Sequence, residues 1–240
     1  MKNLSSSARV YILSSILVGW GLTAWMLMKL DWANPGLYLL AALGALAQTL
    51  KVEGPGSRTN YSIAWFVYGF TFITFGPAGT IFVVFISHLV EWIWHKCPWY
   101  IQCFNIGAHV ISVYLAGLIF ELVTQGTQVL DLNVAAGLVA ANLIFVLGNH
   151  FLVGLVVKLA RGQSFAESGI FGFTSLFLDF TVLSMGAITA LVWHSNPFAS
   201  VLNILPLYLL YNALRVPSLE YQLRRIKKVS PQIKLETNGD

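Results

Sequence analysis

The sequence predicts an all-α protein, a polytopic helical bundle with six to eight transmembrane helices and both termini in the cytoplasm. Of the 240 residues, 57% are hydrophobic and 10% are charged, whereas a soluble domain carries about a quarter charged residues. The charges fall mainly between long apolar runs. Backbone amides in hydrocarbon are satisfied only in helices or closed barrels, and these runs lack the period of two that barrel strands show. Helices are therefore expected throughout.

Apolar windows divide the chain into eight candidate spans. In chain order they cover residues 10–28, 36–50, 61–75, 78–94, 99–123, 134–157, 170–193 and 198–214. The second and third are short, about 22 Å at 1.5 Å per residue against a hydrocarbon core of about 30 Å, so a re-entrant pair is the alternative. Either arrangement gives two parts, a membrane bundle of residues 1–214 and a cytoplasmic tail of residues 215–240.

Single residues mark the ends and bends of these spans. Lys2 and Arg9 precede the first span, which is too long for the core of a signal peptide and has no small-residue cleavage site after it, so a retained helix is expected. Gly76 and Pro77 predict a tight hairpin between the third and fourth spans. Pro206 should bend the last span, because proline removes one helical hydrogen bond.

The basic residues set the orientation. With a cytoplasmic N-terminus, thirteen of the fourteen Lys and Arg residues fall on the inner side, and only Lys29 falls outside. Cytoplasmic loops of membrane proteins carry this excess of positive charge. Both termini are therefore predicted in the cytoplasm of a cell with a bacterial-type inner membrane.

Asp179 lies near the middle of the seventh span. An aspartate at the centre of a membrane helix costs about 2.5 to 3.5 kcal/mol on insertion scales, so it should face the bundle interior. Ligand binding is one role for such a group. A carboxyl group that only bonds a neighbouring helix is the alternative.

Three histidines and two asparagines also fall within spans. His88 and His109 lie near mid-membrane, whereas His150, Asn105 and Asn149 lie in the inner half. Polar side chains at this depth are expected to face one another or a water-filled cavity. Together with Asp179 they predict a ligand cavity that opens toward the cytoplasm.

The same residues also suggest a metal site, a proton relay or a haem site. His88 and Glu91 share a helix face, a spacing that suits a metal or a proton relay, although Glu91 is expected to reach the lipid headgroups instead. A haem between His109 and either His88 or His150 is a further hypothesis. No cofactor follows from the sequence, and Cys97 and Cys103 are expected to be structural thiols.

The tail is basic and amphipathic. Its candidate contacts with the membrane surface or a partner are Arg215, Arg224, Arg225, Lys227 and Lys228. Each basic residue near a surface of anionic lipid contributes about 1 kcal/mol, so binding to headgroups is the simplest role. Coupling to a cytoplasmic or membrane protein is the other. No nucleic-acid partner is expected.

Short motifs between residues 57 and 214 carry a family resemblance. They are Phe75-Gly76-Pro77, Pro98-Trp99-Tyr100, Phe104-Asn105, Ala116-Gly117-Leu118, Asp179 and Leu205-Pro206-Leu207. As a set they resemble the N-terminal membrane domain of bacterial signalling proteins, in which it precedes a cyclic-di-GMP phosphodiesterase of the HD type or a diguanylate cyclase. More distantly, the chain is similar to substrate-binding subunits of vitamin uptake transporters. The resemblance implies a sensory or ligand-binding membrane module without its own catalytic domain.

Three functions remain open at this stage. No protease, hydrolase, nucleotide-binding or dinucleotide-binding signature is present, so the residues predict no enzyme. The preferred hypothesis is a sensory or ligand-binding module that signals through its tail. The alternatives are a solute transporter or transporter subunit, and a structural subunit of a membrane complex.

Overall fold

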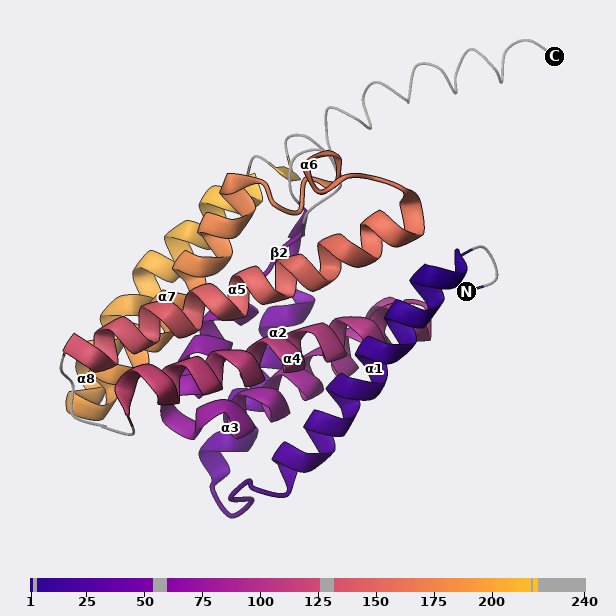
Figure 1. Cartoon of the computed structure of the whole chain (residues 1–240). Helices are drawn as coiled ribbons and strands as arrows, with labels where there is room; N and C mark the ends of the chain where they lie inside the picture. Colours follow the sequence, from indigo (N-terminus) through magenta and orange to yellow (C-terminus); the bar gives the residue numbers. More distant parts are fainter. Residues whose placement is uncertain (2–3, 54–59, 126–131, 217, 220–240) are drawn as a thin grey trace, which may run out of the picture.

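The computed structural model describes residues 1, 4–53, 60–125, 132–216 and 218–219. Its helices are α1 (Ser6–Leu27), α2 (Pro35–Thr49), α3 (Ala64–His95), α4 (Trp99–Thr124), α5 (Leu132–Arg161), α6 (Phe165–Ser168), α7 (Phe173–Ser195) and α8 (Pro197–Ser200). A 3₁₀ turn, η1 (Val201–Asn203), follows α8, and the chain is then helical to Val216. Within the described residues the only extended structure is an antiparallel ladder of β1 (Val52–Glu53) and β2 (Asn60–Tyr61). The prediction of an all-α fold is confirmed (Figure 1).

In the part of the chain that the structure describes, six helices are long and apolar enough to cross a membrane. They are α1, α3, α4, α5, α7 and the segment Pro197–Val216, which continues through α8 and η1. Helix α2 is apolar but shorter. These lengths and compositions fit a multi-pass membrane protein.

Helix α3 is a hairpin of two arms. Gly76 adopts φ 65° and ψ −170°, outside the helical region, so the chain turns there and Pro77 starts the second arm. Gln48, at the end of α2, is hydrogen-bonded to Ser62 before the first arm and to Glu91 in the second, at 2.9 Å in both cases. Both arms therefore run along α2 in opposite directions. The predicted hairpin at Gly76-Pro77 is confirmed, and glycine suits the turn because side chains disfavour positive φ.

Helix starts follow local capping chemistry. The hydroxyl of Ser5 accepts from the amide of Ala8 (3.2 Å), so α1 begins before the predicted span. Asn34 and Asn196 cap α2 and α8 in the same way, each followed by a proline in the first turn. The third predicted span began too early, because Tyr61 belongs to β2.

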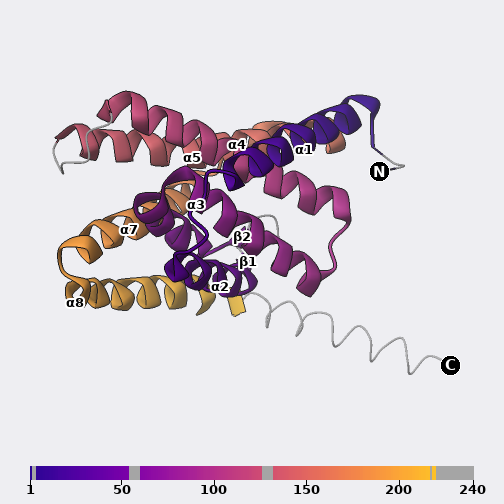
Figure 2. The same ribbon diagram turned by 90° about the horizontal axis from the view of Figure 1, so that it is seen from below.

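The bundle is layered. Helices α1, α4 and α5 lie on one side, α2 and α8 on the opposite side, and α3 and α7 between them (Figure 2). The backbones approach closely at glycines: a Cβ atom at Gly186 of α7 would lie 1.9 Å from the carbonyl oxygen of Phe66 in α3, and one at Gly19 of α1 would lie 2.3 Å from the Cα of Gly107 in α4. Small residues make such contacts between membrane helices possible.

The last helical segment leaves its apolar surface uncovered. Phe198 is 88% exposed and Leu202 is 75% exposed. The 3₁₀ turn η1 occupies the turn before Pro206, where the proline removes the helical donor. This irregularity is consistent with the predicted effect of Pro206.

Candidate functional site

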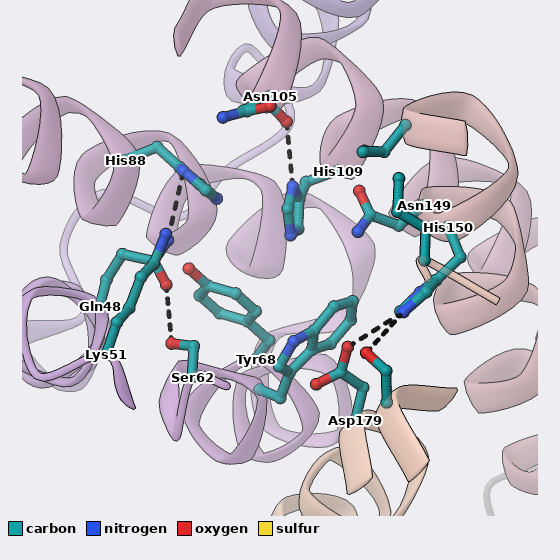
Figure 3. A pocket seen from close by; sticks show the side chains of 14 residues that line it. Gln48, Lys51, Ser62, Tyr68, His88, Asn105, His109, Asn149, His150 and Asp179 are labelled. Carbon is teal, nitrogen blue, oxygen red and sulfur yellow. Dashed lines mark hydrogen bonds and ion pairs between the residues drawn. The ribbon is translucent and has the colours of Figure 1, made fainter. Parts of the chain in front are cut away.

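A cavity of about 210 Å³ lies among α2, α3, α4, α5 and α7. All six residues predicted as ligand-binding line it, and Figure 3 shows their side chains converging: His88, Asn105, His109, Asn149, His150 and Asp179. The expectation that they meet at one cavity is confirmed. Their role toward a ligand stays a prediction.

One wall of the cavity is a buried polar network centred on Glu91. Lys51 and Glu91 form an ion pair, and the amide nitrogens of Gln48 and Gln102 donate to Oε2 of Glu91 at 2.9 and 3.1 Å. Glu91 is 7% exposed. The prediction that Glu91 reaches the headgroups was wrong, because its helix face turns toward α2 and α4 rather than toward lipid.

His88 joins this network through one ring nitrogen. Its Nδ1 lies 3.1 Å from Oε2 of Glu91. The amide nitrogen of Gln102 lies 3.3 Å from the same Nδ1, but it also donates to the carbonyl oxygen of His88 (2.8 Å) and to Glu91. The amide nitrogen of Gln48 also lies 3.4 Å from Nδ1. The carboxylate of Glu91 is nearer and only accepts, so we assign the single hydrogen of the neutral ring to Nδ1. The other nitrogen, Nε2, then presents a lone pair.

His109 and His150 are oriented by their own helices. Nδ1 of His109 lies 3.0 Å from the carbonyl oxygen of Asn105, and Nδ1 of His150 lies 2.9 Å from that of Val146. Carbonyl oxygens only accept, so both rings donate from Nδ1. Two of the histidine rings also lie close together, with the centroids of His88 and His109 4.5 Å apart.

The opposite wall joins α5 to α7. Nε2 of His150 lies 3.4 Å from Oδ2 of Asp179 and 3.5 Å from the hydroxyl of Ser175. Asp179 is 7% exposed, so the prediction that it faces the bundle interior is confirmed. The carboxyl group bridges two helices and at the same time lines the cavity (Figure 3).

Three polar atoms of the cavity wall are buried without a hydrogen-bond partner among the described residues. They are Nε2 of His88, Oδ1 of Asn149 and the hydroxyl of Tyr68. The Ser87 hydroxyl neighbours that of Tyr68; its own hydrogen is donated to the carbonyl oxygen of Val83 (2.7 Å), so toward Tyr68 it can act only as an acceptor. Buried polar atoms are nearly always paired in folded proteins. Three exceptions around one cavity indicate that a molecule bound there would complete their bonds.

The geometry bears on the metal hypothesis and on one of the two haem pairings, that of His109 with His88, whereas the pairing of His109 with His150 stays a prediction. Within the described ranges, no group of three or more His, Cys, Asp or Glu side chains is arranged to hold a metal ion. The rings of His88 and His109 are too close, at 4.5 Å, for a porphyrin to lie between them. Cys97 and Cys103 are both free thiols.

Sequence reasoning missed part of the site. Gln48, Lys51, Ser62, Trp65, Tyr68 and Ser175 also line the cavity. Gln48 was recognisable in principle, since an amide inside an apolar run needs an interior partner. Lys51 was counted only among the thirteen basic residues of the inner side, since a cation at a helix end usually reaches water.

The predicted surface residues lie mostly outside the described part of the chain. Arg215 is described: it is exposed, and its guanidinium lies 5.8 Å from the ring centroid of Tyr211. Arg224, Arg225, Lys227 and Lys228 fall outside the described residues.

Comparison of the chain with protein-family models, with curated proteins and with solved structures gives no match. The resemblance to bacterial signalling domains therefore stays a prediction.

Proposed function

We propose that this protein is a membrane-embedded sensory or ligand-binding module, which takes a small molecule into the cavity around His88, His109 and Asp179. The observation that carries the proposal is the set of unpaired buried atoms on the cavity wall. Leaving a buried polar group unsatisfied costs about 1–3 kcal/mol, which a bound ligand would offset. A purely structural subunit gains nothing from such atoms.

The route of the signal is proposed from chain connectivity. Helix α7 carries Asp179 and leads through Asn196 directly into the segment Pro197–Val216. A ligand that binds Asp179 thus acts on the helix that leads into the last helical segment before the tail. In the proposal the protein lies in a bacterial-type inner membrane, with the cavity in its cytoplasmic half and a protein partner at the tail.

Native mass spectrometry of the gently purified full chain tests ligand binding. A co-purifying small molecule should be retained by the wild type and lost from Val153→Phe, because Val153 lines the cavity and the larger ring fills it. Val139→Phe is the matched control, since Val139 lies on the same helix and is 52% exposed. Equal retention by both variants, or no bound molecule in the wild type, would contradict the proposal.

A transporter is the second candidate, favoured by a second cavity at the other end of the bundle. This cavity of about 910 Å³ is lined by Gly76, Glu121 and His194, among others. Tyr68 lines the first cavity and Phe72, one turn along the same arm, lines the second, and both rings are buried. Uptake of a labelled solute into vesicles with purified protein would favour transport over sensing.

A further inference from the structure

The wall of the central cavity specifies the class of its ligand, and the inference rests on the proposed ligand-binding function. We propose that the ligand is a small organic cation with at least one N–H donor, such as a primary amine, and that Asp179 is its counter-ion.

The hydrogen bonds at the wall leave mainly acceptors facing the cavity. Each of its three histidines uses Nδ1 as a donor to a carboxylate or carbonyl oxygen, at 3.1 Å for His88, 3.0 Å for His109 and 2.9 Å for His150. A neutral imidazole carries one hydrogen, so His88 and His109 present the lone pair of Nε2, whereas that of His150 already faces the hydroxyl of Ser175 at 3.5 Å. Asn149 adds the unpaired oxygen Oδ1. A ligand rich in N–H groups pairs with this set, whereas a carbonyl or carboxylate ligand does not.

The charges of the wall point to the same class. The cation of the wall, Lys51, is already paired with Glu91. Nε2 of His150 lies 3.4 Å from Oδ2 of Asp179, but a ring that donates from Nδ1 and keeps a lone pair on Nε2 is neutral and supplies no positive charge. Lys51 lines the same cavity and attracts Asp179 from a distance, but no lysine or arginine of the described residues forms a direct ion pair with this carboxylate. A buried carboxylate without a cation is costly, and a ligand ammonium group would supply the missing charge.

Aromatic rings and volume limit the ligand further. Trp65 and Tyr68 line the cavity, with ring centroids 6.1 Å apart. Indole and phenol faces attract cations through their negative π surfaces. At about 30 Å³ per water, the 210 Å³ cavity holds about seven water volumes, which suits a compact molecule. An aryl-methyl amine is of this size.

The test is a panel of matched compounds added to the purified full chain in lipid nanodiscs. Benzylamine is the positive probe, benzyl alcohol its neutral match, benzoate the anion, and benzyltrimethylammonium a cation without N–H. At ten times its Kd, benzylamine should raise the Tm by about 3–6 °C. The other three compounds should shift the Tm by less than a third of that value.

Two variants locate the effect. Asp179→Asn keeps the shape of the side chain and removes its charge, so the Kd for benzylamine should weaken at least tenfold. His109→Phe keeps a ring and removes the lone pair, so the Kd for benzylamine should weaken about fivefold. This variant tests the proposal independently if Asp179→Asn does not fold. Phe177→Leu, on α7 and 55% exposed, is the control for nonspecific partition into lipid and should bind like the wild type.

Each contrary result has its own meaning. A larger shift with benzoate or benzyl alcohol than with benzylamine would overturn the cationic class and leave a ligand-binding cavity in place. A panel without any shift would also overturn the class. The ligand-binding function itself fails only if Val153→Phe and Val139→Phe retain the same molecules, or the wild type retains none, in native mass spectrometry.

Discussion

Nε2 of His150 lies 3.4 Å from Oδ2 of Asp179, and this contact joins α5 to α7 at the edge of the central cavity. The two residues are far apart in sequence, and each is an unfavourable residue for the middle of a membrane helix. Their contact gives both a polar partner. It also ties the stability of the bundle to the chemistry of the cavity.

Asp179→Leu should therefore destabilise the protein by about 1–3 kcal/mol, because Nε2 of the buried His150 loses its polar neighbour at 3.4 Å and keeps only the 3.5 Å contact with Ser175. Asp179→Asn should be milder, since the amide keeps its capacity for hydrogen bonds. Thermal unfolding of both variants in detergent measures the difference. A leucine variant more stable than the wild type would show that the pair does not support the fold.

Glu91→Leu should cost about 3 kcal/mol, the lower end of the range for a broken buried ion pair, because the Lys51 side chain is still 23% exposed. Gln48 and Gln102 lose their acceptor at the same time. The control is Glu121→Leu, on the exposed surface of α4, which should change the Tm little. If both variants lowered the stability equally, the ion pair and hydrogen bonds of Glu91 would contribute no more to stability than an exposed glutamate does.

Gly186→Ala should destabilise the packing of α7 on α3 by about 1–3 kcal/mol, since the new methyl group would lie 1.9 Å from the carbonyl oxygen of Phe66. Gly21→Ala is the same substitution in α1 at a position with no atom within 4 Å. It should be neutral or stabilising, because alanine favours helix. Thermal unfolding compares the two, and equal Tm values would argue against the close contact.

The predicted orientation can be tested with reporter fusions. Residues near Lys96, Arg161 and Lys228 should lie in the cytoplasm, and residues near Asp131 and Asn196 outside, because thirteen of fourteen basic residues fall on the inner side. Paired fluorescent and phosphatase fusions at these positions report the side. A cytoplasmic signal at Asp131 would reverse the assignment.

Truncation after Leu214 should leave folding and ligand retention intact but abolish association with a partner. The reason is that residues 215–240 hold the basic surface proposed to transmit the signal. Association with a partner is measured by pull-downs from native membranes, with full-length and truncated protein at low and moderate salt. If the tail only binds anionic lipid, the truncated protein should keep the same partners. Its loss of contact with anionic lipid should then depend on the salt concentration.

Much of the fold could be predicted because membrane helices are specified by hydropathy alone. The windows located each long helix, and Gly76 with Pro77 marked the hairpin. The helix ends were less accurate, since caps such as Ser5 act through one hydrogen bond and leave no apolar signal. The tail residues Arg224 and Lys228 lie beyond what the structure describes.

The site was predicted less completely. Asp179 and the three histidines stood out because polar groups at that depth need a partner. Glu91 did not, since its sequence position gives the distance from the helix end and not the direction of its helix face. The packing of α2 against both arms of α3, which brings Gln48 to Glu91, depends on long-range geometry that no local pattern contains.

The turn at Gly76 also decides whether the chain crosses the membrane an odd or an even number of times. If α3 (Ala64–His95) were one continuous rod and α2 crossed as well, the chain would cross seven times, and its two ends would lie on opposite sides of the membrane. Because the chain doubles back at Gly76, the arms of α3 cancel each other's direction. If α2 is one more crossing, the number becomes even, as the predicted location of both termini on one side requires. The torsion of one glycine would then set the side on which every later loop lies.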